Sequence, residues 1–391
     1  MRRRFFSKFP NNIVNNYLTI EALEDNLSVK LSKNACEYCI NGDGNWINIP
    51  ANTETTTINK GQTLSFRGHL VGNSTDGIGT FSINKKCNIK GNCMSMLFGD
   101  DILNSNQLLN QPYAFLKLFY GGTNIISVDL DILPAVTLTG SNYCYQQMFA
   151  GCTSLVNAPN LPSIKPSTGC CYEMFDGCSS LVDAPKSLEG STSKCYFRMF
   201  RYCTSLVNAP KLSDSACLDG DNCYDRMFAG CTSLVNAPEL PATTITSSCY
   251  LQMFWGCTSL TKAPELPAKI AKTMCYQQMF AGCTSLVNAP ALPAHTLATS
   301  CYQSMFQGCT SLVNSPELPA MKLVSSCYAY MFDNCPKLKV ITMLATSYVA
   351  NALTSWTQGV ASNGTFIKDS GMGSLPRGSS GIPSGWTVVS V

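Results

Sequence analysis

The side chains best suited to chemistry in this sequence are its thiols. There are 22 cysteines and two histidines in 391 residues. Cys36, Cys39, Cys87 and Cys93 lie outside the repeated part of the chain, as a C-x-x-C pair and a C-x5-C pair. Four thiolates could bind zinc, but the wider pair lies near lysines. Plain burial is therefore favoured over a metal site or disulfides, and no cofactor is expected.

The other cysteines recur in pairs eight residues apart, such as Cys144 and Cys152. No histidine recurs with them, so the pattern does not indicate a catalytic thiolate. On one helix the two thiols would lie about 12 Å apart at 1.5 Å per residue, beyond the reach of a disulfide. We expect a ladder of buried thiols, with disulfides between neighbouring units as the alternative.

The carboxylates do not converge in the sequence. Glu239, Glu265 and Glu317 each occupy the same solvent-type position of a repeat. A glycan-active enzyme would need two acids brought together. We therefore expect no enzyme, and a glycan hydrolase is the least favoured of three hypotheses.

A repeat positions these side chains. The dipeptide Met-Phe begins eight times at spacings of 25 to 28 residues, and each unit reads C-Y-x-x-M-F-x-x-C-[TS]-S-L-x-x-A-P-x-L-P. The i, i+4, i+5, i+8 spacing of one helical face is present at Cys144, Met148, Phe149 and Cys152, which predicts a short helix. A strand of about three residues fits near 155–157, because the prolines that follow rule out a longer one. The eight copies of Met-Phe begin at Met148, Met174, Met199, Met227, Met253, Met279, Met305 and Met331.

Such units cannot bury their apolar side alone and must stack. The predicted fold is an α/β solenoid of about eight strand-helix coils, roughly 40 Å long at about 4.8 Å per coil. The insertion DSACLDGDNC, which contains Cys217, predicts a bulge in the stack.

The two ends differ from the repeat. Residues 1–16 form a basic arm, 17–96 have the alternation and turn clusters of a β-sandwich-like domain, and 97–140 form a degenerate capping coil. The solenoid covers 141–339. Residues 340–391 are predicted to be an α/β cap with a helix near 349–360 and strands in GTFIKD and GWTVV.

The segment CYQQMFAGCTSLVNAPNLPSI resembles the BspA-type leucine-rich repeats, whose A-F-x-x-C-x-x-L core is written here as Met148-Phe149, Cys152 and Leu155. Such repeats serve mainly as adhesion and recognition surfaces. One unit departs from the pattern, because Cys171 stands where the other units have Tyr.

The flanks are similar to a group of leucine-rich repeat proteins of gut Bacteroides and their phages. NYLTIEALEDNLSVKLS, KKCNIKGNCMSMLFGD and GTFIKDSGMGSLPRGSSGIPSGWTVV carry that resemblance. It implies a virion protein, such as a tail or head fibre assembled in the host cytoplasm, or a bacterial cell-surface adhesin. Its partners would be a host-surface glycan or protein and, through the N-terminal domain, other virion proteins.

Positions that vary between units are free to serve a partner, whereas constant ones serve stacking. Aromatic and Arg residues, which are enriched in binding hot spots, cluster at variable positions of the third to fifth units; the alternative is an ordinary solvated surface. The constant Val-Asn pairs are expected to support stacking, with Thr261-Lys262 as the exception. The predicted binding residues are Phe197, Arg198, Arg201, Tyr202, Arg226 and Trp255.

Composition excludes other classes. The net charge is only +3, so a nucleic-acid surface is not indicated. No apolar run approaches the roughly 20 residues of a membrane helix. The opening MRRRFFSKFP has a charged region without an apolar core, so classical secretion is not expected. Self-association is left open.

Overall fold

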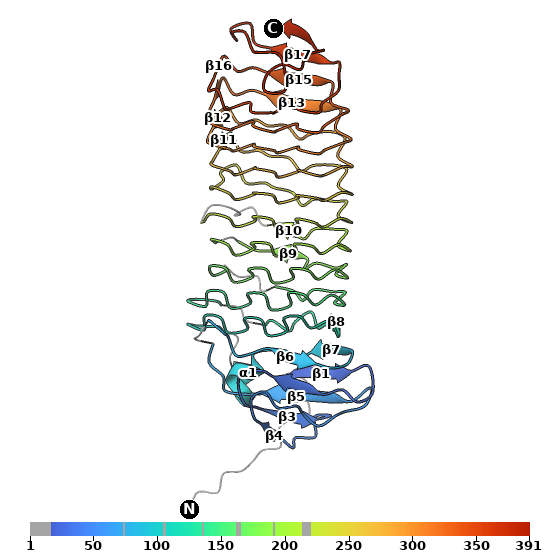
Figure 1. Cartoon of the computed structure of the whole chain (residues 1–391). Coiled ribbons are helices and arrows are strands. Elements are labelled where there is room, and N and C mark those ends of the chain that lie inside the picture. Colours follow the sequence, from blue (N-terminus) through green and yellow to red (C-terminus); the bar gives the residue numbers. More distant parts are fainter. Residues whose placement is uncertain are drawn as a thin grey trace, which may run out of the picture.

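A computed structural model describes residues 17–72, 75–104, 107–134, 137–161, 166–190, 192–212 and 220–391. A small β-domain near the N-terminus is followed by a long stack of coils (Figure 1). The basic arm 1–16 and Cys217, with most of its insertion, lie outside the described residues. None of the helices in the described ranges is long and apolar enough to cross a membrane.

The N-terminal domain is built around a six-stranded sheet of order β4-β3-β5-β1-β7-β8. A separate antiparallel pair joins β2 to β6. Strand β8 pairs in parallel with β7, so the sheet passes directly into the stack. The strands are β1 Leu18–Ala22, β2 Val29–Leu31, β3 Cys36–Ile40, β4 Ile47–Ile49, β5 Thr63–Arg67, β6 Phe81–Ile83, β7 Cys87–Lys90 and β8 Ile125–Val128.

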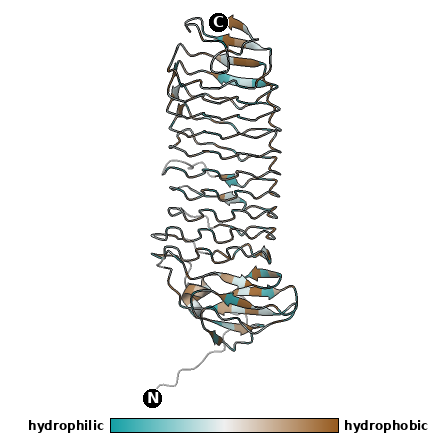
Figure 2. Cartoon of the chain, in the orientation of Figure 1, coloured by the Kyte–Doolittle hydropathy of each residue, from teal (hydrophilic) through white to brown (hydrophobic). Residues whose placement is uncertain are grey.

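The stack is a β-solenoid of about eight turns, numbered here as coils 1 to 8 by their Met-Phe pairs from Met148 to Met331. Short parallel strands and single β-bridges join neighbouring coils. The coils contain both hydrophobic and hydrophilic residues (Figure 2). The strands of the stack are β9 Ser187–Leu188, β10 Lys211–Leu212, β11 Ile270–Ala271, β12 Thr296–Leu297, β13 Asn314–Leu318, β14 Lys322–Leu323, β15 Val340–Met343, β16 Ser347–Tyr348, β17 Thr365–Lys368 and β18 Thr387–Ser390.

The predicted helix of each coil is wrong. The segment is a chain of tight turns in which every fourth residue has positive φ, as at Tyr143, Gln147 and Gly151 in coil 1. In the described part of the chain, helix is confined to α1 (Ser95–Phe98) and the 3-10 helix η2 (Gly99–Asn104). The helix expected near 349–360 is also a run of turns.

The hydrogen bonds of the backbone N–H groups explain why each coil forms turns rather than a helix. Successive N–H groups donate alternately within their own coil and to the next coil. The Met148 N–H donates to Tyr145 O at 3.2 Å within its own turn, whereas the Phe149 N–H donates to Met174 O of the next coil at 3.0 Å. Half of the backbone N–H groups therefore donate to the neighbouring coil, as they do between β-strands. An α-helix would use all of them internally.

The core consists of ladders of identical side chains. The Phe rings of Met-Phe stack from coil to coil, with centroids 5.6 Å apart between Phe254 and Phe280 and an interplanar angle of 5°. The second thiol of each coil donates to a Phe carbonyl of the previous coil, as Cys257 Sγ does to Phe228 O at 3.2 Å. Cys171 stands in coil 2 where the other coils have Tyr, and the parallel ladder of Tyr rings runs beyond it from Tyr196 to Tyr328.

The predicted ladder of buried thiols is confirmed, because every described cysteine is buried and, apart from Cys223 and Cys249, they are free thiols. Cys249 differs because it is disulfide-bonded. Burial raises the pKa of thiols along the ladder, for example to about 12 at Cys275 and Cys283. These thiols are therefore neutral packing groups at physiological pH.

The coil conformation continues beyond the predicted range 141–339 at both ends. The turns of 113–121 donate to coil 1 and stack Phe119 on Phe149. At the other end the turns of 350–359 place Trp356 over Phe332. The parallel sheet β13-β15-β17-β18 then closes the stack, with strands in both segments predicted for the cap.

Candidate functional site

The variable residues of each coil form one surface, called here the turn face. It comprises residues 146–147 and 150–151 of coil 1 and their equivalents. In coil 6, whose sequence Cys275–Pro290 repeats that of coil 1, these residues are Gln277, Gln278, Ala281 and Gly282. Coil 6 therefore serves as the default against which the predicted binding residues can be compared.

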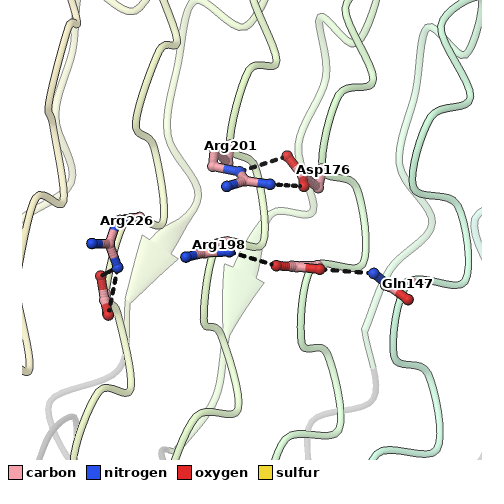
Figure 3. A network of polar contacts seen from close by, with 7 residues as sticks. Gln147, Asp176, Arg198, Arg201 and Arg226 are labelled. Atoms are coloured by element: carbon pink, nitrogen blue, oxygen red, sulfur yellow. Dashed lines mark hydrogen bonds and ion pairs between the residues drawn. The ribbon is translucent and has the colours of Figure 1, made fainter.

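Arg198 of coil 3 is held by an acid of coil 2. Its Nη1 donates to Glu173 Oε1 at 3.1 Å, and the other oxygen of Glu173 accepts from Gln147 Nε2 of coil 1 at 2.8 Å (Figure 3). The Arg198 Nε is buried and has no hydrogen-bond partner. This arginine thus joins coils 1 to 3 and leaves only part of its guanidinium open.

Arg201 and Arg226 are also paired with carboxylates. Arg201 makes a two-point contact with Asp176 of coil 2, and its Nε donates to Asp176 Oδ1 at 3.0 Å. Arg226 binds its neighbour Asp225, with Nη1 3.0 Å from Oδ1 (Figure 3). Burial raises the Asp225 pKa to about 6, against the opposing effect of the arginines. The turn face therefore carries a neutralised charge network rather than a free cationic patch.

Phe197 packs rather than projects. Only 9% of it is exposed. Its ring stacks on Tyr172 with centroids 4.6 Å apart, and the Arg198 guanidinium lies 4.6 Å above it. Phe197 therefore supports Arg198 from below.

Tyr202 is the most unusual of the six. It occupies the position of Gly282 in the default coil and keeps the left-handed backbone, with φ 59°. A bulky side chain in that region costs roughly 1–2 kcal/mol. Its side chain is 47% exposed. A Cβ on Gly230 of coil 4 would lie 2.4 Å from the Tyr202 ring, so the ring leans over the next coil.

Trp255 of coil 5 occupies the alanine position of the default coil. It is 41% exposed, while its neighbour Phe254 is buried in the core. Its backbone N–H donates to Gln252 O at 3.1 Å, which is the ordinary turn bond. The Trp255 indole is thus carried by a coil that keeps the ordinary backbone turn.

Comparison with known proteins identifies the repeat. Residues 221–339 match the family model described as BspA type Leucine rich repeat region, in six copies. Over this range the coils are similar to BspA-type leucine-rich repeats. No curated protein and no solved structure matches the chain significantly. Tyr202 lies in a coil before the matched range, and Trp255 lies within it.

The coils have a second regular surface, the Val-Asn rows. The expected hydrogen bonding of Asn along the stack is confirmed at Asn157, whose Nδ2 donates to Val128 O at 2.7 Å, and at Asn236, whose Nδ2 donates to Asn208 Oδ1 at 2.9 Å. The adjoining valines do not pack into the core: Val235 is exposed, as are Val156, Val182, Val207 and Val287. Sequence alone could not separate these two roles, since both residues recur equally.

The thiols considered for zinc do not assemble a site. Cys36 and Cys39 lie on β3, Cys87 begins β7, and Cys93 follows that strand. All four are buried free thiols. Within the described ranges, no group of three or more metal-ligand side chains could hold an ion. Burial raises the pKa of Cys36 and Cys87 to about 12.

Proposed function

We propose that this protein is a non-enzymatic recognition protein that binds a host-surface glycan through the turn face of coils 3 to 5. The observation that carries the proposal is the replacement of Gly and Ala by exposed Tyr202 and Trp255 in otherwise repeated coils. Exposed aromatic side chains on a rigid support are favoured binding anchors.

The spacing of the two rings suits a chain-like ligand. They lie two coils apart along the stack, about 10 Å at about 4.8 Å per coil. The Tyr202 ring leans over Gly230 of the coil between them. Arg201 lies beside Tyr202, with its guanidinium 5.2 Å from the ring centroid, and its pairing with Asp176 holds it in place. Two aromatic platforms with polar groups between them fit successive sugar rings.

The setting we propose is a phage particle, as a tail or head fibre, with a bacterial cell-surface adhesin as the alternative. The resemblance of the flanks to proteins of gut Bacteroides and their phages supports it, and the elongated stack suits a spike. The N-terminal β-domain would attach to other virion proteins. Mass spectrometry of purified particles should detect the chain. Its detection only on intact uninfected cells would favour the adhesin.

Trp255→Ala restores the default residue and should weaken glycan binding. On an array of bacterial surface polysaccharides, we expect the wild-type protein to bind a subset and Trp255→Ala to lose about 2 kcal/mol, roughly 30-fold in Kd. Gln307→Ala, two coils further along the same row, is the matched control and should bind normally. Equal binding by the wild-type protein and Trp255→Ala would contradict the proposed site.

A further inference from the structure

The charges that follow each A-P dipeptide change sign in the middle of the stack. Coils 2 and 3 carry Lys186 and Lys211, and coils 4 and 5 carry Glu239 and Glu265. All four side chains are exposed. The Lys211 N–H donates to Lys186 O at 3.1 Å, which places the two lysines on consecutive coils. Like charges therefore lie next to each other on both sides of the change.

In the Asn row beside them the charge changes sign in the opposite direction, from negative in coil 2 to positive in coil 5. Asp183 stands in coil 2 and Lys262 in coil 5, with Asn208 and Asn236 between them. Parallel bridges join Asn208 to Asn236 and Asn236 to Lys262. In the described part of the chain, no ion pair involves Asp183, Lys262 or the four charges of the neighbouring row. The arginines of the turn face, in contrast, all have carboxylate partners.

In coils 4 to 6 both rows line one open groove. Two cavities of about 750 and about 870 Å³ share Lys262 and Glu265, and the larger also contains Asn236 and Glu239. Their walls are otherwise mainly Pro, Ala and Leu. An exposed apolar stripe runs beside the Asn row through coils 1 to 4 and again in coil 6, formed by Val156, Val182, Val207, Val235 and Val287.

We propose that this surface binds a second copy of the same chain, antiparallel to the first, about a two-fold axis between coils 3 and 4. Rotation about that axis brings Lys186 opposite the second copy's Glu265 and Lys211 opposite its Glu239. It also brings Asp183 opposite the second copy's Lys262. Each of these contacts occurs twice, as a two-fold interface requires.

The pattern selects this occupant over others. In both rows the sign of the charge changes between coils 3 and 4. A single two-fold axis at that point therefore places each of the six charges of a chain opposite a charge of the other sign. A parallel copy, related by a two-fold axis along the stack, would at best pair Lys186 with the second copy's Asp183 and Glu265 with its Lys262, and would leave Lys211 and Glu239 opposite uncharged Asn208 and Asn236. The valines recur with the period of the coils, so a partner solenoid of equal period can cover the whole stripe. The charges set the orientation, and the apolar stripe supplies buried surface.

Charge reversal tests the proposal on the full-length protein. Sedimentation equilibrium should show a dimer for the wild-type protein. The variant Lys186→Glu with Lys211→Glu should dimerise at least tenfold more weakly, as should Glu239→Lys with Glu265→Lys. An equimolar mixture of these two variants should form a heterodimer, and a chain carrying all four substitutions should again form a homodimer.

The substituted side chains are exposed, and circular dichroism of each variant checks that the coils are retained. The quadruple variant keeps the test informative if one double variant folds poorly. Its two new glutamates lie in coils 2 and 3 and its two new lysines in coils 4 and 5, so the row again has one sign of charge on each side of the axis. A monomeric wild-type protein at micromolar to millimolar concentration would overturn the proposal. Dimerisation of both double variants with wild-type affinity, or a mixture that fails to associate, would overturn it equally.

Discussion

Phe254→Ala is expected to lower the free energy of unfolding by about 3–5 kcal/mol, the usual cost of removing a buried Phe side chain. The Phe254 ring is fully buried and lies between Phe228 and Phe280, with centroid distances of 5.7 and 5.6 Å. Its loss removes two stacking contacts and leaves a cavity in the middle of the ladder. Chemical denaturation followed by circular dichroism measures the change.

The control for Phe254→Ala is Leu251→Ala in the same coil. Leu251 is half-buried on the turn face, so its truncation should cost far less. Because a solenoid is stabilised mainly by contacts between neighbours, hydrogen exchange after Phe254→Ala should accelerate first in coils 4 to 6. A loss below about 1 kcal/mol, well short of a buried aromatic, would contradict the Phe ladder.

Gln278→Pro is expected to cost about 3 kcal/mol or more. Gln278 has φ 54°, which the proline ring cannot adopt, and its N–H donates to Gln303 O of the next coil at 2.8 Å. The substitution therefore breaks both the turn and one bond between coils 6 and 7. Denaturation midpoints and hydrogen exchange at coil 7 report on the two effects.

Gln278→Gly distinguishes the turn from a helix by the sign of its effect. Glycine suits positive φ, so we expect the free energy of unfolding to stay the same or rise by up to about 1 kcal/mol. In a helix the same change would lower it by about 1 kcal/mol. Destabilisation of that size would refute the turn conformation.

The stacking of the chain could be predicted from its sequence, but the backbone conformation could not. The buried residues Cys144, Tyr145, Met148, Phe149 and Cys152 have a period of four, which differs from a helical period by about 80° over eight residues at 100° per residue. Such a short segment does not separate the two periods. The decisive feature is the exchange of alternate N–H bonds between coils, which is a tertiary interaction.

The variable positions of the repeat correctly directed attention to one surface, but not to the role of each residue. The Tyr202 side chain is exposed whereas that of Phe197 is buried, although both occupy variable positions of the repeat. Pairing with Glu173 could not be anticipated for Arg198, because their contact depends on the register between coils. The self-complementary charges were visible in the sequence, yet their meaning required knowing that both rows line one groove.

The most direct test of the recognition account is Tyr202→Gly, with unfolding and glycan affinity measured on the same preparation. The variant restores the default residue at a left-handed position, so the account predicts equal or greater stability together with at least tenfold weaker binding to a polysaccharide that the wild-type protein recognises. Binding that stays at the wild-type level, with stability unchanged or increased, would contradict the claim that Tyr202 is there for recognition.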